Sequence, residues 1–197
     1  MTDKKDLFLD EKLRTGGFYE LCIQICPSIH SQPIKLYTDF LWSLDNVDGP
    51  YDNEFNRTTI DIKNYEHKGL LTVDNKLIPF KTFTIREEDP IETGFNWFDI
   101  SIYTSAIEHV FGDNYKTWTE NPNPPKAIIN FFQETIKELY KIYPFQLAFI
   151  DFEVSGQYYL DDLKGQITNW TKTKFYIGQG NMKLIAEENK EMVTIIE

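Results

Sequence analysis

The sequence predicts an α+β protein with a mostly antiparallel β-sheet and three main helices packed chiefly on one face. Three observations support this fold class. Segments with the two-residue alternation of strands outnumber segments with helical spacing. Several of the predicted strands follow one another as hairpins, which favours an antiparallel sheet over a parallel βαβ fold. Only three segments have apolar residues at helical spacing, and the longest runs from about residue 125 to 142.

The domain organisation follows from chain length and composition. At 197 residues the chain is long for one domain and short for two, and no linker rich in proline, glycine or serine divides it. We therefore predict a single α+β domain over residues 18–197. Residues 1–17 are charged and aperiodic and end in two glycines, so we expect a flexible N-terminal arm.

The chain is acidic, with a formal net charge of −11 and a pI near 4.8. Nucleic-acid affinity depends on Lys and Arg neutralising phosphates, so this charge argues against a nucleic-acid ligand and favours a basic protein partner. No run of about 18 apolar residues occurs, so no membrane span or secretion is predicted. Cys22 and Cys26 are too far apart on one strand to bond, which indicates free thiols in a reducing, bacterial-type cytoplasm.

The first strand is predicted at Phe18–Cys26, where polar and apolar residues alternate. One face of this strand is fully apolar and the other carries Glu20, Cys22 and Gln24, which predicts a sheet covered fully on one side only. A helix is expected from about Pro33, since proline suits a first helical position. The polar stretch Asp45–Asn56 that follows has the composition of a long loop.

The middle of the chain contains a clear hairpin. Strands are predicted at Gly69–Val73 and Leu77–Arg86, with a turn between them and with Pro79 confining the second strand to an edge or bulge. A short strand is expected before the hairpin, at Thr58–Lys63. After a loop at 87–94, Phe95–Tyr103 alternates again and leads into a short helix that ends at Gly112.

The C-terminal part combines the longest helix with the most apolar strand. A loop over residues 113–125 leads into the helix, which feeds directly into Pro144–Gly156. Four alternate residues of this strand are predicted to lie under the helix: Ala148, Ile150, Phe152 and Val154. A helical turn is expected at Tyr158–Gly165. Three short strands should follow, at Lys174–Ile177, Met182–Ala186 and Met192–Ile196.

Candidate catalytic chemistry rests on Asp151 and Glu153, which share one face of the predicted strand. Paired carboxylates are the working groups of glycosidases, so this pair supports an alternative hypothesis of a small hydrolase or carbohydrate-active protein. The three histidines have no metal-binding spacing, and no dinucleotide, P-loop or esterase motif occurs. We therefore predict no metal and no cofactor.

The mixed faces of three strands carry acidic and aromatic residues that would form one open face if the strands are neighbours. Its partner-binding residues would be Glu20, Trp97, Asp99, Tyr103, Asp151 and Glu153. Aromatic side chains would anchor a basic partner, and the carboxylates would speed encounter and pair with Lys or Arg.

The preferred hypothesis is a non-enzymatic protein-binding module of the cytoplasm. Its acidity, small size and aromatic content make it similar in general character to immunity proteins, so the expected partner is a basic toxin. A third hypothesis is a self-associating structural protein, a homo-oligomer that pairs through edge strands such as the one bearing Pro79 or Met192–Ile196.

Overall fold

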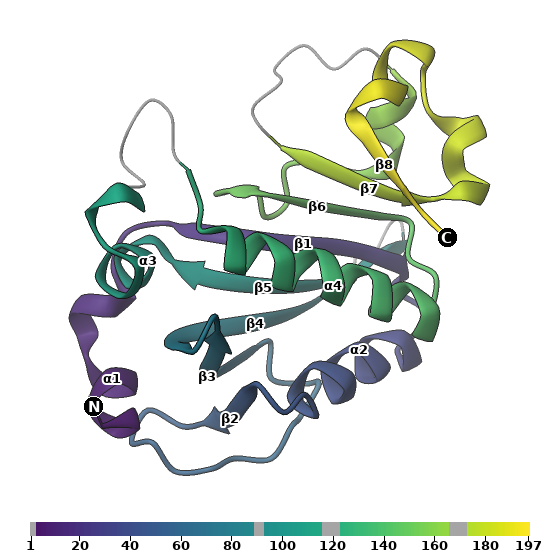
Figure 1. Cartoon of the computed structure of the whole chain (residues 1–197). Helices are drawn as coiled ribbons and strands as arrows, with labels where there is room; N and C mark the ends of the chain where they lie inside the picture. The colour runs from purple at the N-terminus through teal and green to yellow at the C-terminus, as the bar shows by residue number, and fades with distance from the viewer. Residues whose placement is uncertain (1–2, 89–92, 116–122, 166–172) are drawn as a thin grey trace.

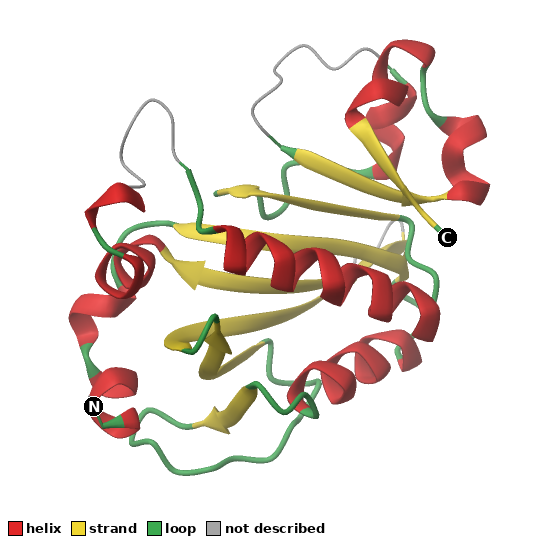
Figure 2. Ribbon diagram, viewed as in Figure 1, coloured by secondary structure: helices red, strands yellow, loops and turns green. Residues whose placement is uncertain are grey.

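The computed structural model describes residues 3–88, 93–115, 123–165 and 173–197. It contains one eight-stranded sheet in the order β2-β3-β4-β5-β1-β6-β7-β8, with all neighbouring pairs antiparallel except β7 and β8. The strands are β1 (Phe18–Pro27), β2 (Val47–Tyr51), β3 (Glu66–Val73), β4 (Lys76–Glu88), β5 (Thr93–Tyr103), β6 (Leu147–Phe152), β7 (Lys174–Gly178) and β8 (Val193–Ile196). The predicted α+β class with a mostly antiparallel sheet is confirmed (Figures 1 and 2).

The longer helices lie mainly against one face of this sheet. They are α1 (Lys4–Leu9), α2 (Gln32–Trp42), α3 (Thr104–Phe111) and α4 (Lys126–Ile142). Figure 1 shows α4 crossing β1 and β5 with α2 beside it. The apolar stripe of α4 buries Ile128, Phe132 and Ile136 against the sheet, in the same cluster as Leu21 and Ile23 of β1. We call this helix-covered side the first face.

The alternation of β1, β5 and β6 predicted the residues of the first face. Tyr19, Leu21, Ile23 and Ile25 of β1 belong to the cluster under the helices, as expected. Ala148 and Ile150 lie there too, and Phe152 packs against its edge. Val154 does not, because β6 ends at Phe152 and Glu153 adopts a positive φ of 54° that turns the chain onto the opposite side.

The N-terminal residues are part of the core instead of lying outside it. Residues 4–9 and 11–14 are helical, and they bury Leu7, Phe8 and Leu13. Phe8 packs edge-on against Tyr51 of β2, with ring centroids 5.4 Å apart. The expected arm is therefore a packed segment, and the signal for it was the apolar spacing of these three residues within a charged stretch.

Two predicted strands are wrong. Residues 58–63 form a loop that pairs with no strand, and Ile60 and Ile62 of this loop pack against the core. Residues 182–184 belong to a 3-10 helix at Gln179–Leu184, and residues 185–186 link it to a second one at Glu187–Met192. Ile185 is buried on the side of the sheet opposite the helix-covered face. In both segments apolar side chains pack against the core without the backbone pairing of a β-strand.

The β3–β4 hairpin is confirmed, and its turn places both Asp74 and Asn75 at positive φ. Pro79 lies in an interior strand, but pairing of β4 with β5 begins only at Lys81. Pro79 is thus paired on the β3 side alone, which removes the conflict with its missing N–H. The predicted loops at 87–94 and 113–125 lie partly outside the described residues. Cys22 and Cys26 are free and buried, as predicted.

Gly69 of β3 offers a test of how α2 packs on the sheet. A β-carbon at this position would lie 2.6 Å from the Trp42 ring and 2.7 Å from the Asp48 carbonyl oxygen. We expect Gly69→Ala to lower the free energy of unfolding by about 1–3 kcal/mol, because a backbone atom cannot yield as a flexible side chain would. Gly165→Ala is the matched control, since no atom lies within 4 Å of its added carbon. Urea denaturation of both variants measures the difference; equal stabilities would contradict this packing.

Candidate functional site

The second face of the sheet is covered over only part of its area. A separate buried cluster lies there over β6, β7 and the neighbouring part of β1 and β5, and residues 154–163 together with Ile185 supply its outer layer. Val154, Leu160, Leu163 and Ile185 are its members from that layer. Phe18 and Phe83, which project from the same face further along the sheet, belong to neither buried cluster and are only half-buried. The half of the second face over β3 and β4 therefore stays open to solvent.

Four aromatic rings contact one another on this open half. Tyr103 pairs with Phe18 across β5 and β1, and their ring centroids lie 4.5 Å apart. Phe18 meets Phe83 of β4 at 6.2 Å, and Phe83 stacks with Tyr65 at 6.1 Å. We call these four residues the aromatic surface. Tyr65, immediately before β3, is 65% exposed and is its most accessible member.

A paired cation sits among these rings. The Nζ of Lys81 donates to Glu66 Oε2 at 2.7 Å and lies 5.1 Å from the Tyr103 ring centroid. Lys68 forms a second ion pair with Glu66 at 2.9 Å. Burial alone would raise the pKa of Glu66, but hydrogen bonds from the two lysines outweigh it, so this pKa is lowered. Two lysines therefore pair with one glutamate beside these rings, and the carboxylate of Glu66 is not left as an unpaired negative charge.

Burial likewise would lower the pKa of Lys81, but its hydrogen bonds to Glu66 and Tyr103 outweigh that effect and raise it. Lys81 therefore stays charged at neutral pH. A lysine held over ring faces also shows that the aromatic surface can accommodate a cation, because the ring quadrupole attracts positive charge.

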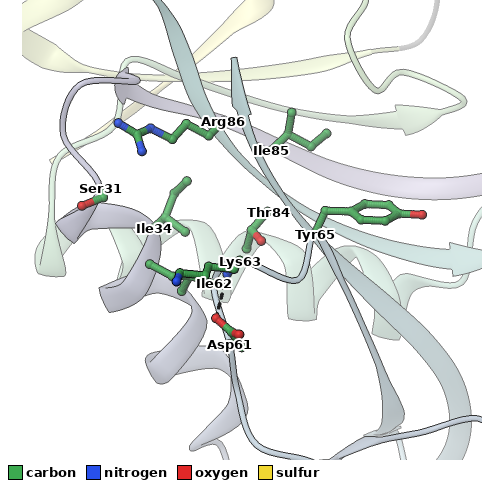
Figure 3. Close-up of a pocket in the computed structure, with 9 residues that line it drawn as sticks. All are labelled: Ser31, Ile34, Asp61, Ile62, Lys63, Tyr65, Thr84, Ile85 and Arg86. Atoms are coloured by element: carbon green, nitrogen blue, oxygen red, sulfur yellow. Dashed lines mark hydrogen bonds between the residues drawn. The ribbon is translucent and has the colours of Figure 1, made fainter. Parts of the chain in front are cut away.

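A cavity of about 730 Å³ opens next to the aromatic surface, between the start of α2, the 61–65 loop and the end of β4 (Figure 3). Its lining residues are Ser31, Ile34, Asp61, Ile62, Lys63, Tyr65, Thr84, Ile85 and Arg86. Figure 3 shows the Tyr65 ring and the Arg86 guanidinium pointing to opposite sides of it. Tyr65 belongs both to this cavity and to the aromatic surface, so the two features form one continuous region.

Three of the six predicted partner-binding residues are enclosed instead of exposed. Glu20, Trp97 and Asp99 are each at most 3% accessible. The expectation that the second face is open is wrong at these positions, because residues after Glu153 fold back over β1, β5 and β6. Sequence alternation assigned these side chains to one face correctly, but it contains no information on which distant segment covers that face.

The other three predicted residues lie at the border of the covered area. Tyr103 is half-buried in the aromatic surface, and Glu153 is exposed beside it, accepting a hydrogen bond from the backbone N–H of Phe18. Asp151 instead accepts a hydrogen bond from Thr173 Oγ1 at 2.7 Å. Phe18 is the first residue of β1 and Thr173 immediately precedes β7. Because β1 and β7 flank β6 on opposite sides, the two carboxylates are directed to opposite neighbours.

Trp97 has a structural role in the covered area. Its indole N–H donates to Glu87 Oε1 at 2.9 Å, and the Tyr159 hydroxyl donates to the same oxygen at 2.9 Å. The Tyr159 ring packs edge-on against the indole, with centroids 5.3 Å apart. Trp97 thus ties the segment after β6 to the sheet, and it is not available as a stacking platform for a sugar.

Glu20 and Asp99 form a buried acidic pair on neighbouring strands. Glu20 Oε2 accepts hydrogen bonds from the backbone N–H groups of Val154, at 3.1 Å, and Ser155, at 3.0 Å. Its other oxygen accepts from Ser101 Oγ at 3.2 Å, while Ser155 Oγ donates to Asp99 Oδ2 at 2.9 Å. The pair therefore fastens the turn after Glu153 to the centre of the sheet.

The two acids differ in how well their charges are supported. Burial and the nearby charge of Glu20 raise the pKa of Asp99 to about 7, against 3.8 for the free group. Burial also raises the pKa of Glu20, but two backbone N–H groups and Ser101 stabilise its charged form and oppose that rise. Asp99 is accordingly protonated at mildly acidic pH.

The sequence patterns did not predict the aromatic surface, although Phe18, Phe83 and Tyr65 all belong to it. The alternation of Phe18–Cys26 places Phe18 on the mixed face of the first strand, while Phe83 lies in a predicted hairpin strand and Tyr65 in no predicted element. The alternation of Lys81, Phe83 and Ile85 within Leu77–Arg86 indicates one side of that strand. That the same side meets Phe18 and Tyr103 depends on the order β4-β5-β1, which local patterns do not specify.

Asp99→Asn tests the electrostatics of the acidic pair. Because the pKa of Asp99 is higher in the folded state, its contribution to stability is greatest at low pH and is lost as pH rises from about 4 to 7. We expect the substitution to raise the free energy of unfolding at pH 8 by roughly 1–3 kcal/mol, and to have a smaller effect at pH 5.

The measurement is urea denaturation of the Asp99 variant at several pH values, with Asp45→Asn, an exposed aspartate, as the control. The control should follow the wild type at every pH. A variant that is destabilised more at pH 8 than at pH 5 would show that Asp99 is needed as a carboxylate, which contradicts the assignment.

The remaining observations set limits on the chemistry. No group of three or more His, Cys, Asp or Glu side chains within the described ranges could hold a metal ion. None of the helices that the structure describes is long and apolar enough to cross a membrane. Comparison of the chain with known protein families, with curated proteins and with solved structures found no match. A functional conclusion must therefore rest on the geometry of the chain itself.

Proposed function

We propose that this chain is a non-enzymatic protein-binding module that receives a basic partner on the aromatic surface. The observation that carries the proposal is the run of four contacting rings on an open part of the sheet. Aromatic side chains are enriched at the energetic centres of protein interfaces, because they bury a large area and lose little conformational freedom.

Two features make the aromatic surface suitable for a protein partner. Phe18, Phe83 and Tyr103 are held on strands, so these residues lose little conformational entropy when a partner binds. The neighbouring cavity provides a recess beside Tyr65 into which an anchor side chain of the partner can fit. Interface hot spots are typically anchors seated in such recesses.

The net charge acts over a longer range than the rings. Because Glu66 is already paired with Lys68 and Lys81, the aromatic surface itself supplies contact area and not a surplus of negative charge. The overall charge of −11 would instead steer a basic partner and raise its association rate. Association should accordingly slow as salt is added, while the apolar contact persists.

The specific form of the proposal is an immunity-type inhibitor that neutralises a basic toxin in the cytoplasm. Buried free thiols at Cys22 and Cys26 fit a reducing compartment. Covering a toxin's active surface requires no catalytic group, which agrees with the structural use of the candidate acids in this chain.

The hydrolase alternative needs Asp151 and Glu153 to face one concave site. Their hydrogen-bond partners lie on opposite sides of β6, and neither residue lines the 730 Å³ cavity. This arrangement gives no support to a pair of carboxylates acting on one substrate.

The experiment measures binding to the purified products of neighbouring reading frames by calorimetry. We expect one basic protein to bind the wild type, and the double variant Tyr65→Ser/Phe83→Ser to bind it at least about tenfold more weakly, because two anchors are lost. Ile142→Ser is the matched control, since Ile142 is an exposed apolar residue, 39% accessible, at the end of α4.

Circular dichroism must first show that the double variant keeps its fold. A partner that binds the double variant as tightly as the wild type would refute the proposed surface. A partner with net negative charge would refute the electrostatic part. For the immunity form, co-expression should rescue cells from the partner's toxicity with the wild type and Ile142→Ser, but not with the double variant.

A further inference from the structure

The two edges of the sheet differ in how they are protected. Edge strands expose unpaired backbone groups, and proteins block them with proline, charge, bulges or covering segments. At one edge, β2 contains Pro50, has a register shift between Asp48 and Tyr51, and is bridged at Tyr51 by Arg57. Ion pairs from Lys4 and Arg57 to Asp48 add further cover. The β2 edge thus has several of the known blocking devices.

The opposite edge, β8, lacks these devices. Its four residues Val193–Ile196 read VTII, with no proline and no charged side chain. β8 pairs only with β7 among the described strands and is the last strand in the order of the sheet. Its backbone groups on the side away from β7 therefore face out of the sheet.

Exposed apolar side chains gather around this edge. Of the seven exposed large hydrophobic residues in the described chain, three are Leu184, Met192 and Ile195, all from the segment that forms and flanks β8. Ile195 is 43% accessible although its register partner on β7, Ile177, is fully buried. Side chains of this type on an open strand are the composition that favours pairing with another strand.

We propose that two copies of this chain associate through β8, pairing the two strands antiparallel about a two-fold axis. A second copy of the chain fits such an edge, because a two-fold axis places the unblocked β8 strands of two copies side by side. Their pairing would join the two eight-stranded sheets into one. The pairing satisfies the outward backbone groups and covers Ile195 of each copy.

The size of this contact sets the expected strength. Stable interfaces bury about 1,200–2,000 Å² in total, and two four-residue strands bury less than that. The dimer should therefore be weak, with a dissociation constant of about 10 μM to 1 mM. It shares no residue with the aromatic surface, whose strand residues lie on β4, β5 and β1, separated from β8 by β6 and β7.

Sedimentation velocity from about 1 μM to about 1 mM tests the proposal. The wild type should shift with concentration from a 23.2 kDa monomer towards a dimer. Ile195→Lys should weaken dimerisation at least about tenfold, because a lysine on an edge opposes pairing. Ile29→Lys, a similar change at an exposed apolar residue in the loop between the central strand β1 and α2, should behave as the wild type.

If Ile195→Lys does not fold, Thr194→Lys provides the same test, since the Thr194 side chain is exposed on the same strand. The proposal is overturned if the wild type stays monomeric at every concentration, or if a folded β8 variant dimerises as strongly as the wild type. Tyr65→Ser/Phe83→Ser should leave dimerisation unchanged, so failure of the proposed partner binding and failure of self-pairing give different results.

Discussion

The hydrogen bonds from Val154 and Ser155 to the buried carboxylate of Glu20 decide how the second face of the sheet is divided. They hold the chain as it leaves β6 and direct the following residues across β1 and β6. Everything those residues cover becomes a second core, with Trp97, Phe149 and Phe175 inside it. Everything beyond them, over β3 and β4, remains a solvent-facing part of the sheet.

That division gives acidic and aromatic residues on one face two different uses. Glu20 and Asp99 serve the covered half, where one holds the turn and the other carries a proton because its charge is poorly supported. Phe18, Phe83 and Tyr103 serve the open half, where their rings meet and enclose a paired lysine. Partner binding is proposed for the second group alone, because only its members contact solvent.

Sequence patterns predicted the parts of the fold that depend on local spacing. The faces of β1, β5 and β6, the β3–β4 hairpin and the long helix α4 all follow from periodicity, because neighbours on a strand or helix have fixed directions. The location of the candidate site did not follow. Trp97 and Asp99 have the composition of an exposed binding face, yet a segment some 55 residues later covers them. Covering of a face is a long-range property that no local pattern specifies.

The central claim is that the open half of the second face is where a partner protein binds. Hydrogen–deuterium exchange of the complex, compared with the free chain, tests it most directly. We predict that binding slows exchange in residues 65–86 and near Tyr103, while α4 is unchanged. Protection confined to the helix-covered face, with β3 and β4 exchanging as in the free chain, would contradict it.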